Sequence, residues 1–328
     1  MSTRTLRSAG LLLAAALALA VQTPDVLAQG NYPNRLVRIV VPNAPGSSPD
    51  IVARLIAQPL IERLGQPVVV DNRAGAGTMI GGEVVAKSPH DGYTLLMGIA
   101  TLAINPATYK KVPYDALRDF APITQAVSLP GILVAHSSLP ARSVKELIAL
   151  AKARPGDIAF ASGGHGSYSH LSTELFINMA GIRMLHVPYK GSGPAVIDLL
   201  AGHVSLMTSN ILSAIPHIRV GRLRALGITS TKRAAGAPDI PTIAEAGLPG
   251  YESVQWSGLL APAGTPREII TRLHKETAAV LRSPEMKERL AKDGAEPVAS
   301  LPEEFAAYIR AETVKWAKIV KSAGIQPE

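Results

Sequence analysis

The chain has 328 residues, of which 47% are hydrophobic and 18% charged, and this balance excludes an intrinsically disordered protein. The formal net charge of +8 would suit an acidic partner. Aromatic residues make up only 4% of the chain and no dense run of lysine or arginine occurs, so a nucleic-acid-binding surface is not expected. The absence of cysteine excludes disulfides and a lipid-anchored lipoprotein.

The first 28 residues have the layout of a secretory signal peptide. Arg4 and Arg7 form a basic start, the uncharged run Leu11–Val21 follows, and Val26-Leu27-Ala28 offers a cleavage site. The apolar run is shorter than the roughly 20 residues that span a bilayer, so a membrane anchor or a buried helix is the less favoured interpretation. We therefore expect export, with cleavage near Ala28.

Beyond this segment, short β-branched runs alternate with longer helical periods, which is typical of βαβ units around a mostly parallel sheet. The first set comprises strands at residues 36–41, 67–70 and 94–97 and helices at 51–64 and near 81–87. A second set begins after Leu129-Pro130-Gly131, with strands at 132–135, 158–161, 185–187 and 225–228 and helices at 144–153, 168–179 and 194–201. The tail contains helices at 266–281, 284–292 and 302–321. The pattern predicts two α/β lobes and a helical tail that packs on the first lobe.

Three turns follow predicted strands, lead into helices and combine glycines with hydroxyl side chains. They are PNAPGSSPD (Pro42–Asp50), DNRAGAGTMIGG (Asp71–Gly82) and SGGHGSYSHLSTELF (Ser162–Phe176). Ser48 is the predicted N-cap after the first turn and Ser167 the one after the third. One such turn is more often a plain βα connection. Three of them favour an anion site, because bare backbone N–H groups at helix N-termini bind anions and because ligands of open α/β sheets bind beyond the carboxyl ends of strands.

The same residues argue against several cofactor and catalytic chemistries. The segment GAGTMIG lacks a dinucleotide fingerprint glycine at Ile80, no P-loop lysine follows a turn, and GHGSY is not a nucleophile elbow. No H-E-x-x-H motif is present. We therefore expect no cofactor, no metal site and no catalytic residue. His165 and His170 flank the third turn and could contact a ligand.

Further segments extend a resemblance that the three turns begin. They are HVPYKGSGPAVIDLLAGHV (His186–Val204), RLRALGITSTKR (Arg222–Arg233) and WSGLLAPAGTP (Trp256–Pro266). Over essentially its whole mature length, the chain resembles the substrate-binding proteins of tripartite tricarboxylate transporters, also called Bug or TctC-like receptors.

The resemblance implies a two-lobed periplasmic binding protein of the type II-like α/β fold, with a mostly parallel sheet and flanking helices in each lobe and a ligand cleft between the lobes. The first lobe would comprise residues 31–126 with 229–328, and the second 127–228. Such a receptor captures a small organic carboxylate, which in this family is a dicarboxylate, a tricarboxylate, an acidic amino acid or an aromatic acid. It delivers the ligand to the membrane permease subunits of the transporter. A monomer is expected.

The family pattern also implies ligand contacts, mainly on the first and third turns. On the first lobe these are Asn43, Gly46, Ser47, Asp50, Gly77 and Thr78, and on the second lobe Ser162, Gly166, Ser167 and His170. Thr101 and Asn210 lie in segments that usually face the cleft. The sequence departs from the pattern at Asn43, Ser47, Thr78 and Ser205, where an aromatic, two glycines and an acid are usual. The pocket is therefore expected to be altered, and no particular family ligand is carried over.

Two helix N-termini facing each other across a cleft could each hold one carboxylate, and binding would then favour the closed form. Two alternatives stay open. One is a periplasmic ligand sensor without a transport role, and the other, less favoured, is an enzyme that acts on an organic acid with His165 or His170 as the base.

Overall fold

The computed structural model describes residues 32–327 apart from 190 and 293. Contacts divide the chain between Asn34 and Arg35, and all the helices and strands described below lie in the unit that starts at Arg35. The predicted signal peptide, residues 1–28, lies outside the described residues. Among the residues that the structure does describe, no helix combines the length and apolarity that a membrane span requires.

The first lobe is built on three parallel strands. β1 (Val37–Val41) lies between β2 (Val68–Asn72) and β3 (Thr94–Ile99), as its run of valine and isoleucine predicts for a strand buried on both faces. The helices that follow these strands are α2 (Ser48–Leu64), the 3₁₀ turn η2 (Ala76–Thr78), α3 (Met79–Ala86) and α4 (Thr101–Thr108). Each strand therefore ends in a turn that starts a helix.

The second lobe repeats this plan. β5 (Ala159–Ser162) pairs in parallel with β6 (Leu185–Pro188) and with β7 (Leu206–Asn210). The accompanying elements are α5 (Val144–Ala153), α6 (Tyr168–Ala180), α7 (Ser192–Ala201), α8 (Ile211–Arg219) and β8 (Leu223–Ile228). The two-lobed α/β fold is confirmed, and the residue boundaries given above for the lobes stay a prediction.

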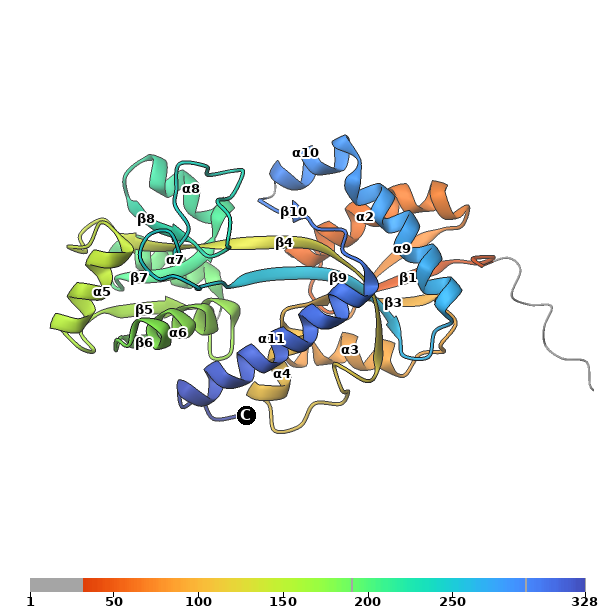
Figure 1. The fold of residues 1–328 in the computed structure, drawn as a ribbon, viewed down its shortest axis with the longest axis horizontal. Coiled ribbons are helices and arrows are strands. Elements are labelled where there is room, and N and C mark those ends of the chain that lie inside the picture. The colour runs from red at the N-terminus through yellow and green to blue at the C-terminus, as the bar shows by residue number, and fades with distance from the viewer. Residues whose placement is uncertain (1–31, 190, 293, 328) are drawn as a thin grey trace, which may run out of the picture. The chain divides into compact units, whose positions relative to one another are not determined.

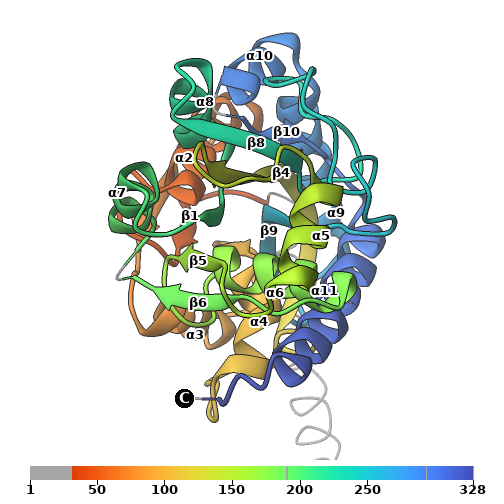
Figure 2. The ribbon, with the colours of Figure 1, turned by 90° about the vertical axis from the view of Figure 1, so that its left-hand side faces the viewer.

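Two long antiparallel strands run between the lobes, as Figure 1 shows and Figure 2 shows end-on. β4 (Phe120–His136) pairs with β9 (Val254–Pro262) up to Pro130, and from Gly131 onward it pairs with β7 and β8. The short β10 (Glu296–Pro297) also pairs with β4. The strand order along the sheet is β2-β1-β3-β9-β4-β7-β5-β6, with β8 and β10 pairing with β4 outside this path. The outer strand pairs are therefore parallel and the central ones antiparallel.

The strand predicted at 132–135 is part of a longer one, because β4 starts at Phe120 and continues through Leu129-Pro130-Gly131. The turn-like sequence instead marks the place where β4 changes partners. Pro130 lies opposite Val254 of β9, and Gly131 lies opposite Asn210 of β7. The Gly131 N–H donates to Thr229 Oγ1 at 2.7 Å. A side chain therefore accepts the backbone hydrogen bond at the point where β4 changes partner strands.

The tail forms α9 (Arg267–Arg282), α10 (Pro284–Lys292) and α11 (Pro302–Ser322). α11 buries apolar residues that recur at helical spacing, including Phe305 and Trp316. It packs against α4 and β4, as expected for a tail that packs on the first lobe, and it also contacts α6 of the second lobe. The Phe305 ring meets Trp256 of β9 edge-to-face, with centroids 5.3 Å apart.

Close packing of α11 on the crossing strands makes Gly258 of β9 intolerant of a side chain. A Cβ there would overlap the Phe305 ring and would lie 2.7 Å from the Thr124 carbonyl oxygen. We expect Gly258→Ala to lower the free energy of unfolding by about 1–3 kcal/mol, as overpacking does, in urea denaturation. Gly193→Ala in α7 is the control, because no heavy atom lies within 4 Å of its Cβ. Equal stability of the two variants would contradict this packing.

Candidate ligand-binding site

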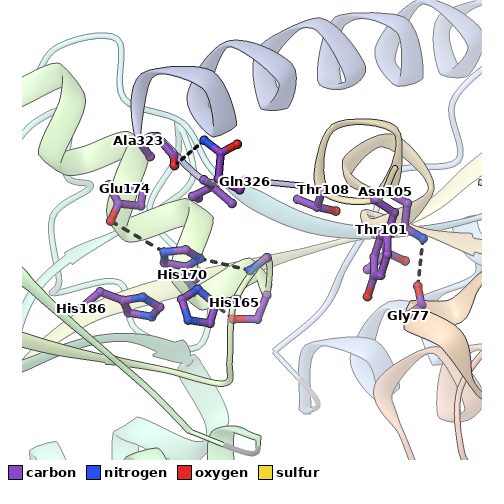
Figure 3. A pocket seen from close by; sticks show the side chains of 15 residues that line it. Gly77, Thr101, Asn105, Thr108, His165, His170, Glu174, His186, Ala323 and Gln326 are labelled. Atoms are coloured by element: carbon purple, nitrogen blue, oxygen red, sulfur yellow. Dashed lines mark hydrogen bonds and ion pairs between the residues drawn. The ribbon is translucent and has the colours of Figure 1, made fainter. Parts of the chain in front are cut away.

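Residues of both lobes and of the C-terminal segment line a cavity of about 590 Å³. Figure 3 shows the side chains that line it. Its size falls within the range of roughly 300–1,000 Å³ that is usual for small-molecule sites. The lining consists of Gly77, Thr101, Asn105, Thr108, Tyr109, His165, Gly166, Ser167, His170, Glu174, His186 and Ala323, Gly324, Ile325 and Gln326.

The third turn and the N-terminus of α6 form the second-lobe wall. Ser167 is the N-cap, as predicted, and its Oγ accepts from the His170 N–H at 3.3 Å. Gly166 has φ +66°, a conformation that glycine adopts without steric cost. The first turn of a helix leaves N–H groups without intrahelical partners, and these groups attract anions. The wall therefore offers backbone donors to a negatively charged ligand atom.

Helix α4 forms the first-lobe wall. Thr101, Asn105 and Thr108 are four and then three positions apart, so they lie on one face of the helix and point to the cavity. The Asn105 side chain donates to the Gly77 carbonyl oxygen at 2.9 Å, and the Thr78 and Thr101 hydroxyls lie 2.7 Å apart. These bonds fix the second turn against α4. A hydroxyl-rich and amide-rich surface thus faces the α6 N-terminus.

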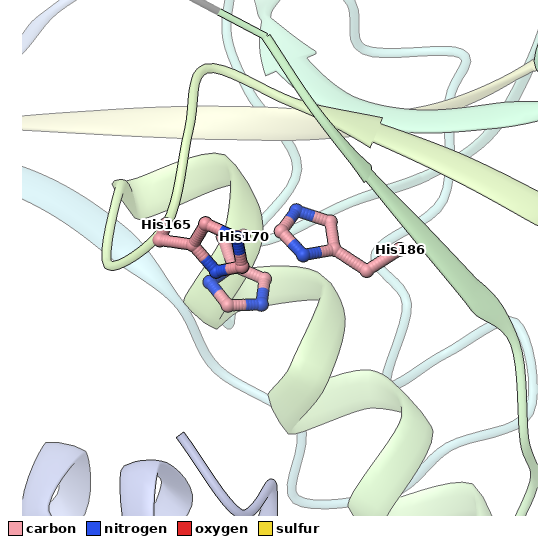
Figure 4. Close-up of side chains that lie close together, drawn as sticks. All are labelled: His165, His170 and His186. Atoms are coloured by element: carbon pink, nitrogen blue, oxygen red, sulfur yellow. The ribbon is translucent and has the colours of Figure 1, made fainter. Parts of the chain in front are cut away.

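Three histidines stand side by side in the second-lobe wall, as Figure 4 shows. The rings of His170 and His186 are stacked 3.8 Å apart, and His165 meets both edge-on at 5.6 and 5.1 Å. His186 reaches this place because β6 pairs in register with β5, with Phe160 opposite His186. Burial and the neighbouring imidazoles lower the pKa of His170 to about 3 and that of His186 to about 4, so both rings are neutral at pH 7.

Glu174 lies one helical turn after His170. Its Oε1 is 3.7 Å from His170 Nε2, and burial raises the pKa of the Glu174 carboxyl to about 7. The Gly166 N–H donates to His170 Nδ1 at 3.1 Å, and in a neutral ring the proton is therefore on Nε2, facing Glu174. Because His170 is neutral, its contact with Glu174 is not an ion pair.

The structure brings five of the predicted ligand-binding residues to the cavity, and they are Gly77, Thr101, Gly166, Ser167 and His170. Thr78 is not a lining residue, but its hydroxyl lies 2.7 Å from that of Thr101. Ser162 does not line the cavity, but its Oγ lies 2.6 Å from Nε2 of the lining residue His186. Asn43, Gly46, Ser47, Asp50 and Asn210 are not among the lining residues. For these residues, contact with a ligand stays a prediction.

The first turn is held by the side chain of Asp50 and its partners in α2 and β2. The Asp50 carboxylate is 2% exposed and accepts from the Gly46 N–H at 2.8 Å, from Asn72 at 3.0 Å and from Arg54 at 3.1 Å. The N-cap of α2 is Ser47 and not Ser48 as predicted, and the Ser47 hydroxyl donates to the Ala44 carbonyl oxygen instead of capping the helix. Asp50 thus replaces the serine as the acceptor that holds this turn.

The prediction did not include Asn105, Thr108, Tyr109, Glu174, His186 and the C-terminal residues Ala323, Gly324, Ile325 and Gln326. Two signals could have found some of them. Asn105 and Thr108 follow Thr101 at helical spacing, and Glu174 follows His170 by four positions. For His186 and the C-terminal residues the sequence has no comparable signal.

Comparison with known proteins places the chain in a family. Residues 52–325 match the model described as tripartite tricarboxylate transporter family receptor. The chain belongs to this family. It is 43% identical over 295 residues to BugT of Bordetella pertussis, a match that covers 89% of this chain and 90% of BugT.

Two solved structures are similar to this chain over most of its length. A protein of R. palustris solved with adipate is 41% identical, with a TM-score of 0.77, and the match covers 90% of this chain and all of that one. MatC from Rhodopseudomonas palustris, with bound malate, is 33% identical, with a TM-score of 0.72. This second match covers 88% of this chain and 100% of MatC.

The bracing role of Asp50 predicts a pH-dependent stability effect. Burial acts to raise the pKa of Asp50, but the hydrogen bonds from Arg54, Gly46 and Asn72 outweigh it and hold the pKa below its ordinary value. Asp50→Asn should therefore lower the free energy of unfolding by about 1.5–3 kcal/mol at pH 7, as the loss of hydrogen bonds to a charged group does. The difference should shrink as the pH falls below about 4, where the unfolded carboxyl takes up its proton.

Urea denaturation at several pH values checks this expectation. Asp157→Asn serves as the control, because Asp157 is exposed. A deficit for Asp50→Asn that is equally large at every pH would mean that the ionised carboxylate does not brace the turn.

Proposed function

We propose that the protein is a periplasmic receptor that captures a small organic carboxylate in this cavity and delivers it to the permease subunits of a tripartite tricarboxylate transporter. One observation carries the proposal. The N-terminus of α6, capped by Ser167, faces the hydroxyl and amide groups of α4 across a cavity of ligand size. Family membership supports the transport role, and the predicted signal peptide supports the compartment.

The two walls suit a ligand with two acidic ends. A helix N-terminus carries about half a positive charge together with N–H donors, and one carboxylate would bind there. The second carboxylate would accept from the Thr101 hydroxyl, because the Asn105 amide already donates to the Gly77 carbonyl oxygen at 2.9 Å and to Tyr114 Oη at 3.5 Å. Because neither wall holds both ends, the ligand favours the closed form of the receptor. Adipate and malate, which the similar structures contain, are dicarboxylates of this kind.

Binding without turnover is also part of the proposal. A general base works best when its pKa lies near the operating pH, and the imidazoles of His170 and His186 have pKa values of about 3 and 4. Neither ring would take up a substrate proton effectively at pH 7, and Glu174, whose pKa is raised to about 7, has its carboxyl turned to His170 Nε2 at 3.7 Å. Turnover of an organic acid by the purified protein, lost in His170→Ala, would contradict this part of the proposal.

A ligand panel tests the carboxylate class. Protein that has been unfolded and refolded to remove carried-over ligand is heated with malate, adipate, citrate or aspartate, and separately with the diamide of adipic acid. We expect at least one acid to raise the melting temperature, as any ligand that binds only the native state does, and the diamide to have no effect. If none of the acids acts while another compound class does, the ligand is not a carboxylate.

The N-cap of α6 offers a sharper prediction with a built-in control. Ser143 caps α5 with the same bond, from the N–H three residues on, but it lies outside the cavity lining. Ser167→Ala and Ser143→Ala should each lower the free energy of unfolding by about 1 kcal/mol, the usual value of a serine cap. Only Ser167→Ala should also weaken ligand binding, roughly tenfold for a loss of about 1.4 kcal/mol.

Calorimetric titration with the best acid of the panel measures the affinities of the two variants. If both variants bind that acid as the parent protein does, Ser167 is a helix cap and nothing more.

A further inference from the structure

The three histidines of the cavity wall come from three different elements. His165 lies in the third turn and is exposed, His170 lies in the first turn of α6 and is buried, and His186 lies in β6 and is partly buried. One nitrogen from each ring can be chosen so that all three lie within 4.8 Å of one another. The sequence spacing predicted no metal site, because the fold and not a local motif gathers these residues.

We propose that His165, His170 and His186 form a binding site for a divalent transition-metal ion of the zinc type. Neutral imidazole is a preferred ligand of such ions, and three imidazoles leave at least one coordination position open. The wall in which they lie faces the cavity, so the open position is available to a bound ligand.

Hydrogen bonds fix the tautomer of His170 and orient the ring of His186. Nε2–H of His170 faces the Glu174 carboxyl at 3.7 Å, so Nδ1 carries the lone pair, which the Gly166 N–H now meets. His186 Nε2 lies 2.6 Å from the Ser162 hydroxyl, so Nδ1 is the nitrogen of this ring that is left for a metal ion. In the metal-bound form, Nε2–H of His186 would donate to Ser162 Oγ. Metal-binding histidines characteristically donate the other ring N–H to a carboxylate or another oxygen in this way.

Binding requires a local adjustment. Zinc–nitrogen bonds of about 2.0–2.1 Å in a tetrahedron bring the ligand nitrogens to roughly 3.3 Å from one another, which is closer than the present limit of 4.8 Å. The parallel rings of His170 and His186 cannot both aim a lone pair at one ion, so one of them must turn. His170 is held inside α6, and the movement therefore falls to His186 and to the exposed His165.

In the described part of the chain, the cavity lacks positively charged side chains that could pair with a carboxylate, and a bound metal ion would supply that charge. Among its described lining residues there is no lysine or arginine, and Glu174 adds an acidic group. A divalent ion would supply the positive charge that a carboxylate otherwise lacks here, and the ligand carboxylate would fill the open coordination position. This second step rests on the proposed function, whereas the metal site itself does not.

Titration of chelator-treated protein with Zn²⁺ alone tests the site. We expect one ion per chain, and we expect Co²⁺ at the same site to give the visible absorption of tetrahedral coordination. His165→Ala should weaken Zn²⁺ binding at least tenfold and remove the Co²⁺ spectrum without changing the melting temperature of the metal-free protein. Glu174→Gln should weaken binding about 10- to 100-fold, as the loss of a partner of a metal-binding histidine does.

His203→Ala is the matched control, because the His203 side chain is 71% exposed and is not a member of the cluster. It should bind Zn²⁺ as the parent protein does. Absence of stoichiometric Zn²⁺ binding by the parent protein, or undiminished binding by His165→Ala, would overturn the proposal.

A second titration separates this inference from the proposed function. Malate and adipate are titrated with and without Zn²⁺, and tighter binding in its presence supports the second step. Equal carboxylate affinity in both conditions contradicts the second step and leaves the proposed function intact. Absence of carboxylate binding in both conditions contradicts the proposed function, while the Zn²⁺ titration still decides the metal site.

Discussion

Because β4 pairs with β9 up to Pro130 and with β7 and β8 from Gly131 onward, one continuous strand holds both lobes. The cavity depends on this arrangement. Its first-lobe wall is carried by α4, which follows β3 beside β9, and its second-lobe wall by α6, which follows β5 beside β7. Helix α11 packs on β4, α4 and α6 together, and its C-terminal continuation closes one side of the cavity.

Local signals made much of the second lobe predictable from the sequence. The bounds of α5 were predicted correctly as Val144–Ala153, because Ser143 caps it by a bond within four residues. The third turn and its cap, Ser167, are equally local. Both depend on hydrogen bonds between near neighbours in the chain, which residue type and spacing determine.

Where sequence signals conflict with the fold, the prediction was incomplete: only residues 132–135 of β4 were predicted as a strand, and α4 was not predicted. β4 contains Pro130-Gly131, which resembles a turn, and α4 contains Pro106 within eight residues. His186 enters the site through the pairing register of β6 with β5, and Gln326 through the packing of α11. These are contacts between distant segments, and no periodicity within one segment encodes them. The departures from the family pattern at Asn43, Ser47 and Ser205 lie outside the cavity lining, so the chemistry of the cavity depends more on His165, His186 and Glu174.

The structure of a complex with malate or adipate tests the central claim most directly. The account predicts one ligand carboxylate within hydrogen-bonding distance of the first-turn N–H groups of α6, beside Ser167 and the three histidines. The other carboxylate should lie against Thr101 of α4. A dicarboxylate bound elsewhere on the protein, with this cavity left to solvent, would contradict the account.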